Sequence, residues 1–293
     1  MRKLMTTLSI AICLSLIGTA NAQDNNFAKL IGNVPVGDIK AGAEDEISTL
    51  IWGGDIPLMF ANGTNLSTQP KSYFASQGWN VKLVPGDNYI EQVKKYITGE
   101  RVLLRGTMGM LGQSSEVTGA DPRTKPTILV QYTYSLGDHI VGRGTIKNLN
   151  DLKDFEKKNS RKPVIVAQQG GPHVVLIYES LKIVGMTIDD VEIVWVKDLA
   201  GPAGPAAYFR KPTEKAADLC CVITPDMLGL CSGLDQVGSG AEGTIANASV
   251  VNSTSSMSRV VVDVIACRTD WYNANKEKAA KFVAAYLKAL KML

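Results

Sequence analysis

Short β-branched runs alternate with segments of helical periodicity along most of this chain. Residues 164–167 and 191–196 are runs of the kind found in buried parallel strands. Between them, Val174, Ile177 and Leu181 recur at helical spacing, and Gly185 follows as a helix stop. Strands that alternate with helices in this way predict an α/β protein with mostly parallel sheets.

The same pattern predicts further strands at residues 47–52, 81–84, 103–107, 128–134 and 260–266. Two helices are expected to begin at capping residues. Asp87 precedes one of them as a predicted N-cap. Asn148 precedes the other, and Asp151 stands where a capping box needs an acidic partner.

The alternation is interrupted twice. Leu136-Gly137-Asp138 follows one strand, and the Gly-, Ser- and Asn-rich residues 232–258 precede the strand at 260–266. A chain that leaves one sheet, builds a second α/β unit and returns for a last strand and helix would show both breaks. We therefore expect lobe I at residues 23–135, lobe II at 136–257, and a return to lobe I at 258–293. Two crossings between lobes would form a hinge with a cleft.

The first 22 residues have the features of an export signal. Arg2 and Lys3 precede an apolar stretch at residues 4–17, and Ala20-Asn21-Ala22 is a small-residue cleavage site. The apolar stretch is shorter than a membrane span requires, and no later segment reaches about 18 uninterrupted apolar residues. The sequence therefore predicts an exported, soluble protein that is cleaved after Ala22.

Composition argues against several classes of function. The chain has 31 Lys and Arg against 28 Asp and Glu, a net charge of +3 at pH 7. This small net charge does not indicate binding to nucleic acid or to an anionic membrane. Two histidines and the lack of a C-x-x-C motif leave little for a metal centre. Hydrolase and metalloprotease motifs are also missing. We expect no metal, no cofactor, no nucleic-acid partner and no enzymatic activity.

Four cysteines follow the predicted cleavage site: Cys220, Cys221, Cys231 and Cys267. Disulfides persist in oxidising compartments, so export favours at least one. Adjacent strand residues point to opposite faces, so only one of Cys220 and Cys221 easily reaches a given partner. We expect one bridge, from Cys231 to Cys220 or Cys221, against the alternative that several are small buried apolar residues.

Loops that follow strands carry the candidate binding residues, because ligands in open α/β sheets bind where such loops lead into helices. Gln169-Gly170-Gly171-Pro172-His173 opens a long helix, where free N–H groups can hold an anion or a carbonyl oxygen. The alternative is a tight connection in which Pro172 merely starts the helix. The predicted ligand-binding residues are Trp52, Gly53, Asp55, Thr107, Met108, Ser135, Asp138, Gln169, Gly170, His173, Thr224 and Asp226.

Two acidic positions have competing interpretations. An exposed Trp52 beside Asp55 suits stacking and hydrogen bonding to a small polar or cationic solute, whereas a core tryptophan and a helix-capping aspartate fit equally well. Asp263 is a lone carboxylate within the apolar run 260–266, so it must be hydrogen-bonded or face water. For Asp263 we expect a structural role near the crossing rather than contact with a ligand.

Several segments resemble a known family. They are Gly54-Asp55-Ile56-Pro57, residues 134–141 (YSLGDHIV), residues 146–153 (IKNLNDLK), the strand–Gln–Gly–helix unit that ends at His173, and Val262-Asp263-Val264. Over roughly residues 47–290 the chain is similar to the periplasmic solute-binding proteins of ABC transporters, in the branch that binds nitrate, sulfonates, taurine and thiamine pyrimidine precursors.

The resemblance implies a two-lobed type II periplasmic-binding-protein fold, each lobe a mixed, mostly parallel sheet flanked by helices. It also implies a periplasmic monomer that captures a small solute between its lobes and delivers it to an ABC permease in the inner membrane. An exported enzyme that pairs His173 with a carboxylate, and a sensor or adaptor on the same scaffold, are the alternatives.

The chain also departs from the family pattern. The family's Trp-Glu-Pro ligand segment corresponds here to Ile223-Thr224-Pro225-Asp226, the glycine of its Asp-Leu-Lys-Gly-Lys stretch is replaced, and the chain ends earlier than many relatives. Asp55, Asp138 and Asp226 would repel an anion if they faced it. An amine, a pyrimidine-like heterocycle or another neutral polar solute is therefore the expected ligand.

Overall fold

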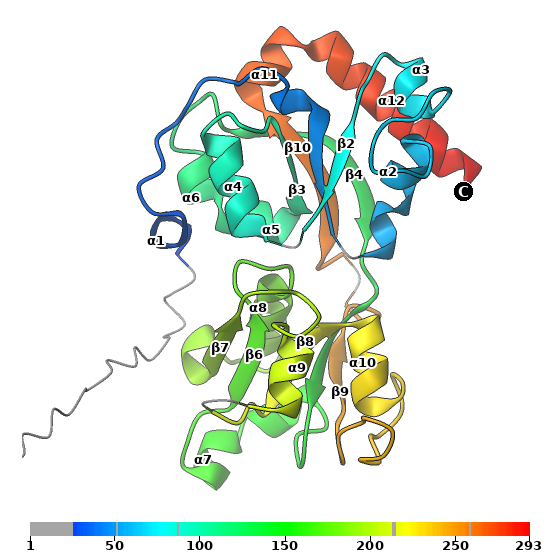
Figure 1. The fold of residues 1–293 in the computed structure, drawn as a ribbon. Coiled ribbons are helices and arrows are strands. Elements are labelled where there is room, and N and C mark those ends of the chain that lie inside the picture. The colour runs from blue at the N-terminus through cyan, green and yellow to red at the C-terminus, as the bar shows by residue number, and fades with distance from the viewer. Residues whose placement is uncertain (1–25, 51, 87, 213–214, 258) are drawn as a thin grey trace, which may run out of the picture.

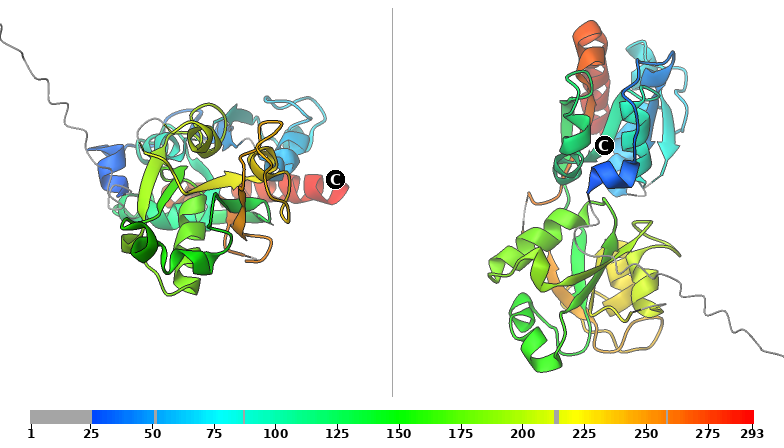
Figure 2. Two further views of the ribbon diagram at one scale, coloured as in Figure 1. Left: turned by 90° about the horizontal axis from the view of Figure 1, so that it is seen from below. Right: turned by 90° about the vertical axis from the view of Figure 1, so that its left-hand side faces the viewer.

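The structure is a computed structural model that describes residues 26–50, 52–86, 88–212, 215–257 and 259–293. Two lobes lie one above the other in Figure 1, and the right-hand view of Figure 2 shows the same separation. The predicted export signal at residues 1–22 and the predicted cap Asp87 lie outside the described residues. Within the described ranges, no helix combines the length and apolar content needed to cross a membrane.

The upper lobe contains both ends of the described chain. Strand β1 (Glu46–Thr49) pairs in parallel with β2 (Lys82–Pro85). Strand β10 (Val262–Arg268) returns from the lower lobe and lies between β3 (Leu103–Thr107) and β4 (Pro126–Tyr134), antiparallel to both. This pairing joins segments more than 120 residues apart in the sequence, so it places side chains of β3 and β10 next to each other.

Helices cover both faces of the upper sheets. One core packs α2 (Ile56–Ala61), α3 (Tyr73–Ser76), α11 (Thr269–Ala274) and α12 (Lys276–Met292) on one side. The other core packs α1 (Phe27–Ile31), α4 (Tyr89–Ile97), α5 (Met108–Gln113) and α6 (Ser115–Thr118). Phe282 of α12 stacks on Phe74 at 5.2 Å between ring centroids, so the last helix packs on the upper lobe.

The lower lobe has a five-stranded sheet in the order β7-β6-β8-β5-β9. Its strands are β5 (Asp138–Gly142), β6 (Val164–Gln168), β7 (Glu192–Val196), β8 (Leu219–Ile223) and β9 (Ser249–Ser253). Helices α7 (Phe155–Asn159) and α8 (His173–Ile183) contribute to the core on one face, and α9 (Pro205–Arg210) and α10 (Thr224–Cys231) to that on the other. Short 3-10 turns occupy Ala43–Asp45, Gly53–Asp55, Leu149–Leu152 and Ile188–Asp190.

Two segments connect the lobes. One is the three-residue link from β4 to β5, and the other leads from β9 to β10. They are joined where the Ser135 N–H donates to the Val261 carbonyl oxygen at 2.9 Å. The expected α/β architecture with helix-flanked sheets is confirmed, but the sheets are more mixed than the strand pattern predicts, because β5, β9 and β10 run antiparallel to their neighbours.

Local signals predict element starts with mixed success. The capping box at Asn148 and Asp151 is confirmed. Helix α4 is capped by Asn88, whose side chain accepts from the Glu91 N–H at 3.1 Å. The strand predicted at residues 47–52 ends at Thr49, and the chain turns at Gly53 before α2.

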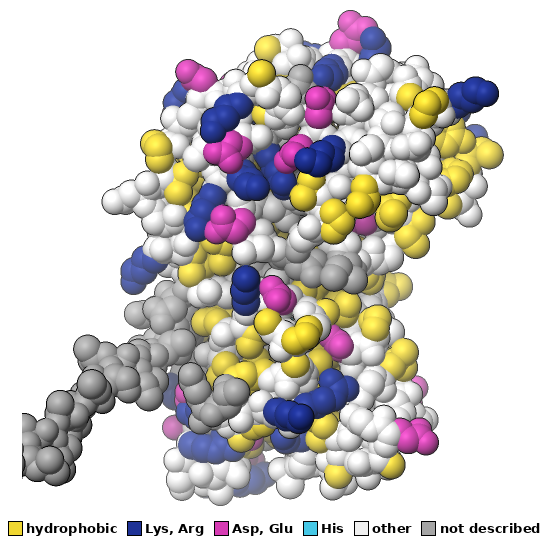
Figure 3. All heavy atoms as spheres, in the orientation of Figure 1, with side chains coloured by type: hydrophobic (Ala, Val, Ile, Leu, Met, Phe, Trp, Pro, Cys, Tyr) yellow, Lys and Arg dark blue, Asp and Glu magenta, His cyan; other side chains and the backbone are white. Residues whose placement is uncertain are grey.

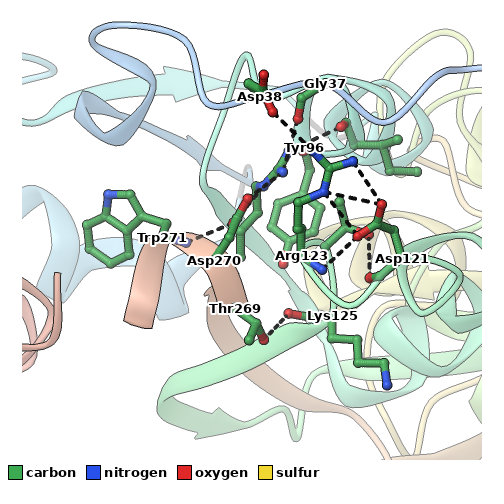
Figure 4. Close-up of polar contacts among 12 residues, drawn as sticks. Gly37, Asp38, Tyr96, Asp121, Arg123, Lys125, Thr269, Asp270 and Trp271 are labelled. Carbon is green, nitrogen blue, oxygen red and sulfur yellow. Dashed lines mark hydrogen bonds and ion pairs between the residues drawn. The ribbon is translucent and has the colours of Figure 1, made fainter. Parts of the chain in front are cut away.

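A buried arginine fixes the end of β10 that lies away from the crossing. Arg268 is fully buried, and its guanidinium donates to the carbonyl oxygens of Tyr96 and Gly37 at 3.0 and 3.1 Å. It also pairs with Asp270 at 2.7 Å. Figure 4 draws these partners together. The cluster therefore ties the N-terminal segment and α4 to the end of β10.

The predicted disulfide is not formed, so this prediction is wrong. Cys220, Cys221, Cys231 and Cys267 are free and buried. Cys220 packs in the core beneath α9 and α10, and Cys221 lies on the opposite face beneath α8. The Cys231 thiol donates to the Met227 carbonyl oxygen at 3.3 Å. These cysteines act as small apolar side chains, which was the alternative reading of the sequence.

Reducing agents are accordingly expected to leave the thermal unfolding midpoint unchanged. In the native protein these thiols should react slowly with a thiol reagent, since burial raises their pKa values, that of Cys267 to about 12. All four should react at once after denaturation. A midpoint that falls on reduction, measured in parallel scans with and without reductant, would contradict the free-thiol assignment.

Candidate functional site

A small cavity lies between the lobes beside the two connecting segments. Its volume is about 20 Å³, enough for roughly one water molecule. Its polar lining residues are Trp52, Ser135, Asp138 and Asp263, and its apolar ones are Leu50, Pro172, Leu199, Ile223 and Val261. Residues from both lobes therefore enclose it.

The lobes touch directly beyond this cavity. The Gln113 side-chain amide of α5 donates to the Gly171 carbonyl oxygen before α8 at 3.3 Å. Gly109 of α5 lies so close to Val175 of α8 that a Cβ atom there would be 3.0 Å from the valine Cγ1. The two lobes therefore contact each other at α5 and α8 as well as around the cavity.

The upper wall of the cavity is supported by a buried ion network. Arg105 of β3 is 1% exposed, and its Nε and Nη2 donate to Asp55 Oδ1 at 3.1 and 3.0 Å. Its Nη2 also lies 3.3 Å from Asp263 Oδ1. The Tyr132 hydroxyl and the Leu50 N–H donate to the two oxygens of Asp55 at 2.8 and 2.6 Å. The network holds β3, β4, β10 and the turn before α2 in one arrangement.

Asp55 was predicted to bind the ligand, but in the structure it lies outside the lining of the cavity. It is 3% exposed and does not line the cavity, because both of its oxygens are engaged by Arg105, Tyr132 and Leu50. Its geometry is that of a residue that positions Arg105, and through it Asp263.

Asp263 lines the cavity, whereas the sequence favoured a structural role without ligand contact. Its side chain is 4% exposed, and Oδ1 pairs with Arg105 while Oδ2 has no hydrogen-bond partner. Burial raises the pKa of Asp263 to about 7, against the opposing effect of Arg105. The Trp52 indole also approaches this carboxyl group, yet its Nε1 is left without a completed hydrogen bond. Two buried polar atoms beside the cavity are therefore unsatisfied.

The lower wall is built around Asp138, the first residue of β5. His173 Nε2, at the start of α8, donates to Asp138 Oδ1 at 2.8 Å, and the Ser135 hydroxyl donates to Oδ2. Burial alone would raise the pKa of Asp138, but the interactions with His173 and the bond from Ser135 together outweigh it, so the pKa lies below its usual value. Asp138 is therefore a well-supported carboxylate in the cavity wall.

The other histidine supports the same wall from behind. His139 bonds Ser253 through Nδ1 and Thr224 through Nε2, both at 2.9 Å. Burial lowers the pKa of His139 to about 4, so its ring is neutral at neutral pH. Neither histidine is visible on the face drawn in Figure 3, where charges of both signs are scattered over the two lobes.

Of the predicted binding residues, the structure brings Trp52, Ser135 and Asp138 to the cavity and places His173 directly behind Asp138. Thr224 bonds His139 and the Gly137 carbonyl oxygen, and Thr107 caps α5 by accepting from the Met110 N–H. The residues Gly53, Met108, Gln169 and Gly170 do not line the cavity.

Asp226 was also predicted to bind the ligand, but it lies away from the cavity between the lobes. It lines a separate surface pocket with Arg210 and Lys211, between α9 and α10. Burial raises its pKa. The loop-after-strand pattern places Thr224 at the start of α10, but Asp226 turns with the helix away from the cavity between the lobes.

The sequence analysis did not single out Arg105 and Tyr132, and it expected a structural role for Asp263, whose ion pair with Arg105 agrees with that expectation. One signal was present: Arg105 and Asp263 are opposite charges in two otherwise apolar runs, and buried charges need partners. Only the non-local pairing of β3 with β10 shows that they are each other's partners.

No protein-family model and no curated protein matches this sequence. Solved structures do match its fold. The periplasmic nitrate-binding protein NrtA from Synechocystis PCC 6803 is 17% identical with a TM-score of 0.61, covering 87% of this chain. This chain spans only 63% of the length of NrtA.

Two sulfonate-binding proteins are also similar. The aliphatic sulphonate binding protein SsuA from Escherichia coli is 12% identical with a TM-score of 0.57, covering 85% of this chain and 69% of its own. The alkanesulfonate-binding protein SsuA from Xanthomonas axonopodis pv. citri, bound to MOPS, is 11% identical with a TM-score of 0.58, covering 85% and 74%. The predicted two-lobed periplasmic-binding-protein fold is thus confirmed, and at these identities the likeness concerns the fold alone.

Proposed function

We propose that this protein is an exported solute-binding receptor that closes its two lobes around a small polar solute and delivers it to an ABC permease. The observation that carries the proposal is the cavity between the lobes, where Asp263 Oδ2 and Trp52 Nε1 are buried without partners. Buried polar atoms are nearly always hydrogen-bonded, so unsatisfied ones at a cavity favour a ligand there. The nitrate- and sulphonate-binding proteins of the same fold support a receptor role.

The two connecting segments are the proposed hinge. They lie next to each other and border the cavity through Ser135 and Val261. A solute in that position contacts both lobes only when they are closed. Because a ligand shifts such an equilibrium only through its extra contacts in one state, a cavity lined from both lobes suits capture by closure. The working form in this proposal is a periplasmic monomer cleaved after Ala22.

The geometry favours binding over catalysis. Ser135, Asp138 and His173 are the residue types of a hydrolytic triad, but their order differs. Asp138 lies between the serine hydroxyl and the histidine, and His173 Nε2 is directed at the carboxylate. A histidine must bond the nucleophile itself to take its proton. Ser135 therefore lacks the histidine base of such a triad, and the cluster holds Asp138 in place.

Replacing Gly109 by leucine should keep the lobes apart. The new side chain would meet Val175 across the gap, since even a Cβ at this position lies 3.0 Å from Cγ1 of that residue. We expect a larger radius of gyration by small-angle X-ray scattering. Solute affinity should fall roughly tenfold, because closure then costs about 1.4 kcal/mol or more. Gly112→Leu on the same helix is the control, as no atom lies within 4 Å of a Cβ there.

The solute for this test comes from a thermal-shift panel of amines, nitrate, sulfonates and pyrimidines. A ligand that binds only the folded state raises the unfolding midpoint. The proposal fails if no member of the panel does so. It also fails if the Gly109→Leu and Gly112→Leu variants bind the stabilising solute equally well.

A further inference from the structure

We infer that the captured solute carries a compact ammonium group, which pairs with the free oxygen of Asp263 as the lobes close. This inference rests on the proposed function and names the class of solute. Two independent features of the cavity lead to it: the charge of its walls and an unmet hydrogen-bond acceptor.

The ionisable side chains in the described wall of the cavity are both carboxyl groups. Asp138 from the lower lobe and Asp263 from the upper lobe both line it, and its described lining includes no lysine or arginine. Arg105 lies behind the wall and is shared between Asp263 and Asp55. Its single positive charge cannot balance both Asp55 and Asp263 once Asp263 is ionised. An anion in the cavity would add to the negative charge, whereas a cation would reduce it.

The unmet acceptor is Asp263 Oδ2. The side chain is 4% exposed, so water cannot freely solvate this oxygen. No described residue completes a hydrogen bond to it, although the Trp52 indole approaches the same carboxyl group. A carboxylate in this position needs N–H donors, and an ammonium group supplies three of them with a full positive charge. Asp138 contrasts with it, because His173 and Ser135 already donate to both of its oxygens.

The size of the cavity limits the group to a compact one. A volume of about 20 Å³ admits roughly one water-sized group in the closed form. A primary ammonium matches this size, whereas a quaternary ammonium is too large and has no N–H to donate. Methylammonium is therefore the smallest organic probe with the required chemistry.

Affinity for methylammonium should rise as the pH is raised through about 7 and then level off. Asp263 must lose its proton to pair with the cation, and burial holds its pKa at about 7. The groups that face it are Arg105 on β3, Asp55 in the turn before α2, Asp138 on β5 and the neutral Trp52. The alkylammonium itself stays charged to about pH 10. An anionic solute would show the opposite trend, because it binds better to the protonated carboxyl group.

The test is isothermal titration of the protein with methylammonium, tetramethylammonium, formamide, nitrate and methanesulfonate, each at pH 5.5 and 8 as working values on either side of about 7. We expect binding of methylammonium alone, tighter at the higher pH. Asp263→Asn should weaken it roughly tenfold or more, since it removes a charge-assisted hydrogen bond. Asp226→Asn, which alters a carboxyl group outside this cavity, should bind as the unaltered protein does.

The outcomes separate the two proposals. Binding of nitrate, methanesulfonate or formamide without methylammonium overturns the ammonium assignment and leaves the receptor function standing. Binding of none of the probes overturns the ammonium assignment, while the wider thermal-shift panel decides the receptor function by itself. If Asp263→Asn does not fold, the pH series on the unaltered protein still decides: affinity for methylammonium that is flat or falls with pH overturns the assignment.

Discussion

Arg105→Met is expected to lower the free energy of unfolding by about 3–5 kcal/mol, the usual cost of removing one partner from a buried ion pair. The guanidinium is 1% exposed and is the only described cation within ion-pair distance of Asp55 and Asp263. Without it, two carboxyl groups would remain in a site from which water is nearly excluded. Methionine fills much of the same volume, so the loss reports charge and hydrogen bonding rather than a cavity. Urea unfolding followed by circular dichroism measures it.

A matched control is Arg161→Met in the lower lobe. Arg161 pairs with Asp218 at 2.6 Å, but its side chain is 44% exposed. Exposed pairs contribute about 0–1 kcal/mol, so this variant should be nearly as stable as the unaltered protein. The double variant Arg105→Met with Asp263→Asn should recover part of the loss, because it removes one of the stranded charges. Equal stability of Arg105→Met and Arg161→Met would show that the network is not buried as described.

Local patterns predicted the fold because each of its elements is specified nearby in the sequence. The apolar spacing of Val174, Ile177 and Leu181 places one face of α8 in the core, as predicted. The Asn148 and Asp151 capping box needs only four consecutive residues. The return of the chain to the upper lobe is also marked locally, by the Gly-, Ser- and Asn-rich residues 232–258 that precede β10. Such features depend on short-range geometry, which sequence periodicity reports directly.

The site was only partly predictable, because its charges meet through non-local pairing. Asp138 and Ser135 could be found, since a loop that ends one strand and begins the next must lie at the edge of a sheet. Arg105 and Asp263 lie inside strands, and they meet because β10 inserts between β3 and β4 in antiparallel register. Asp226 shows the converse limit. The pattern identified its loop correctly, but not the direction that its side chain takes once the helix begins.

The contribution of Asp263 to the stability of the unliganded protein is expected to fall as the pH rises from about 4 to about 7. Asp263 has an ordinary pKa of 3.8, and burial raises it to about 7 in the folded state. Between these values the folded protein retains a proton that the unfolded chain has lost, so raising the pH favours unfolding. About three pKa units at about 1.4 kcal/mol each amount to about 4 kcal/mol from this residue alone.

The effect of Asp138 on the pH dependence of stability has the opposite sign to that of Asp263. Its pKa is lowered in the folded state despite burial, because His173 and Ser135 bond the ionised form, so its contribution is present above its ordinary pKa of 3.8 and is lost at lower pH.

His139 also opposes Asp263, because burial lowers its pKa from 6.5 to about 4, so its contribution to stability is lost as the pH falls toward 4. The two effects largely offset each other, and the profile between about pH 4 and 7 should be nearly level. Urea midpoints measured across this range test the prediction: in Asp263→Asn only the His139 effect remains, so this variant should gain stability as the pH rises from about 4 to about 6.5. A profile of Asp263→Asn that matches the unaltered protein would contradict a raised pKa of Asp263 and remove the thermodynamic support for a buried, unsatisfied carboxyl group at the cavity.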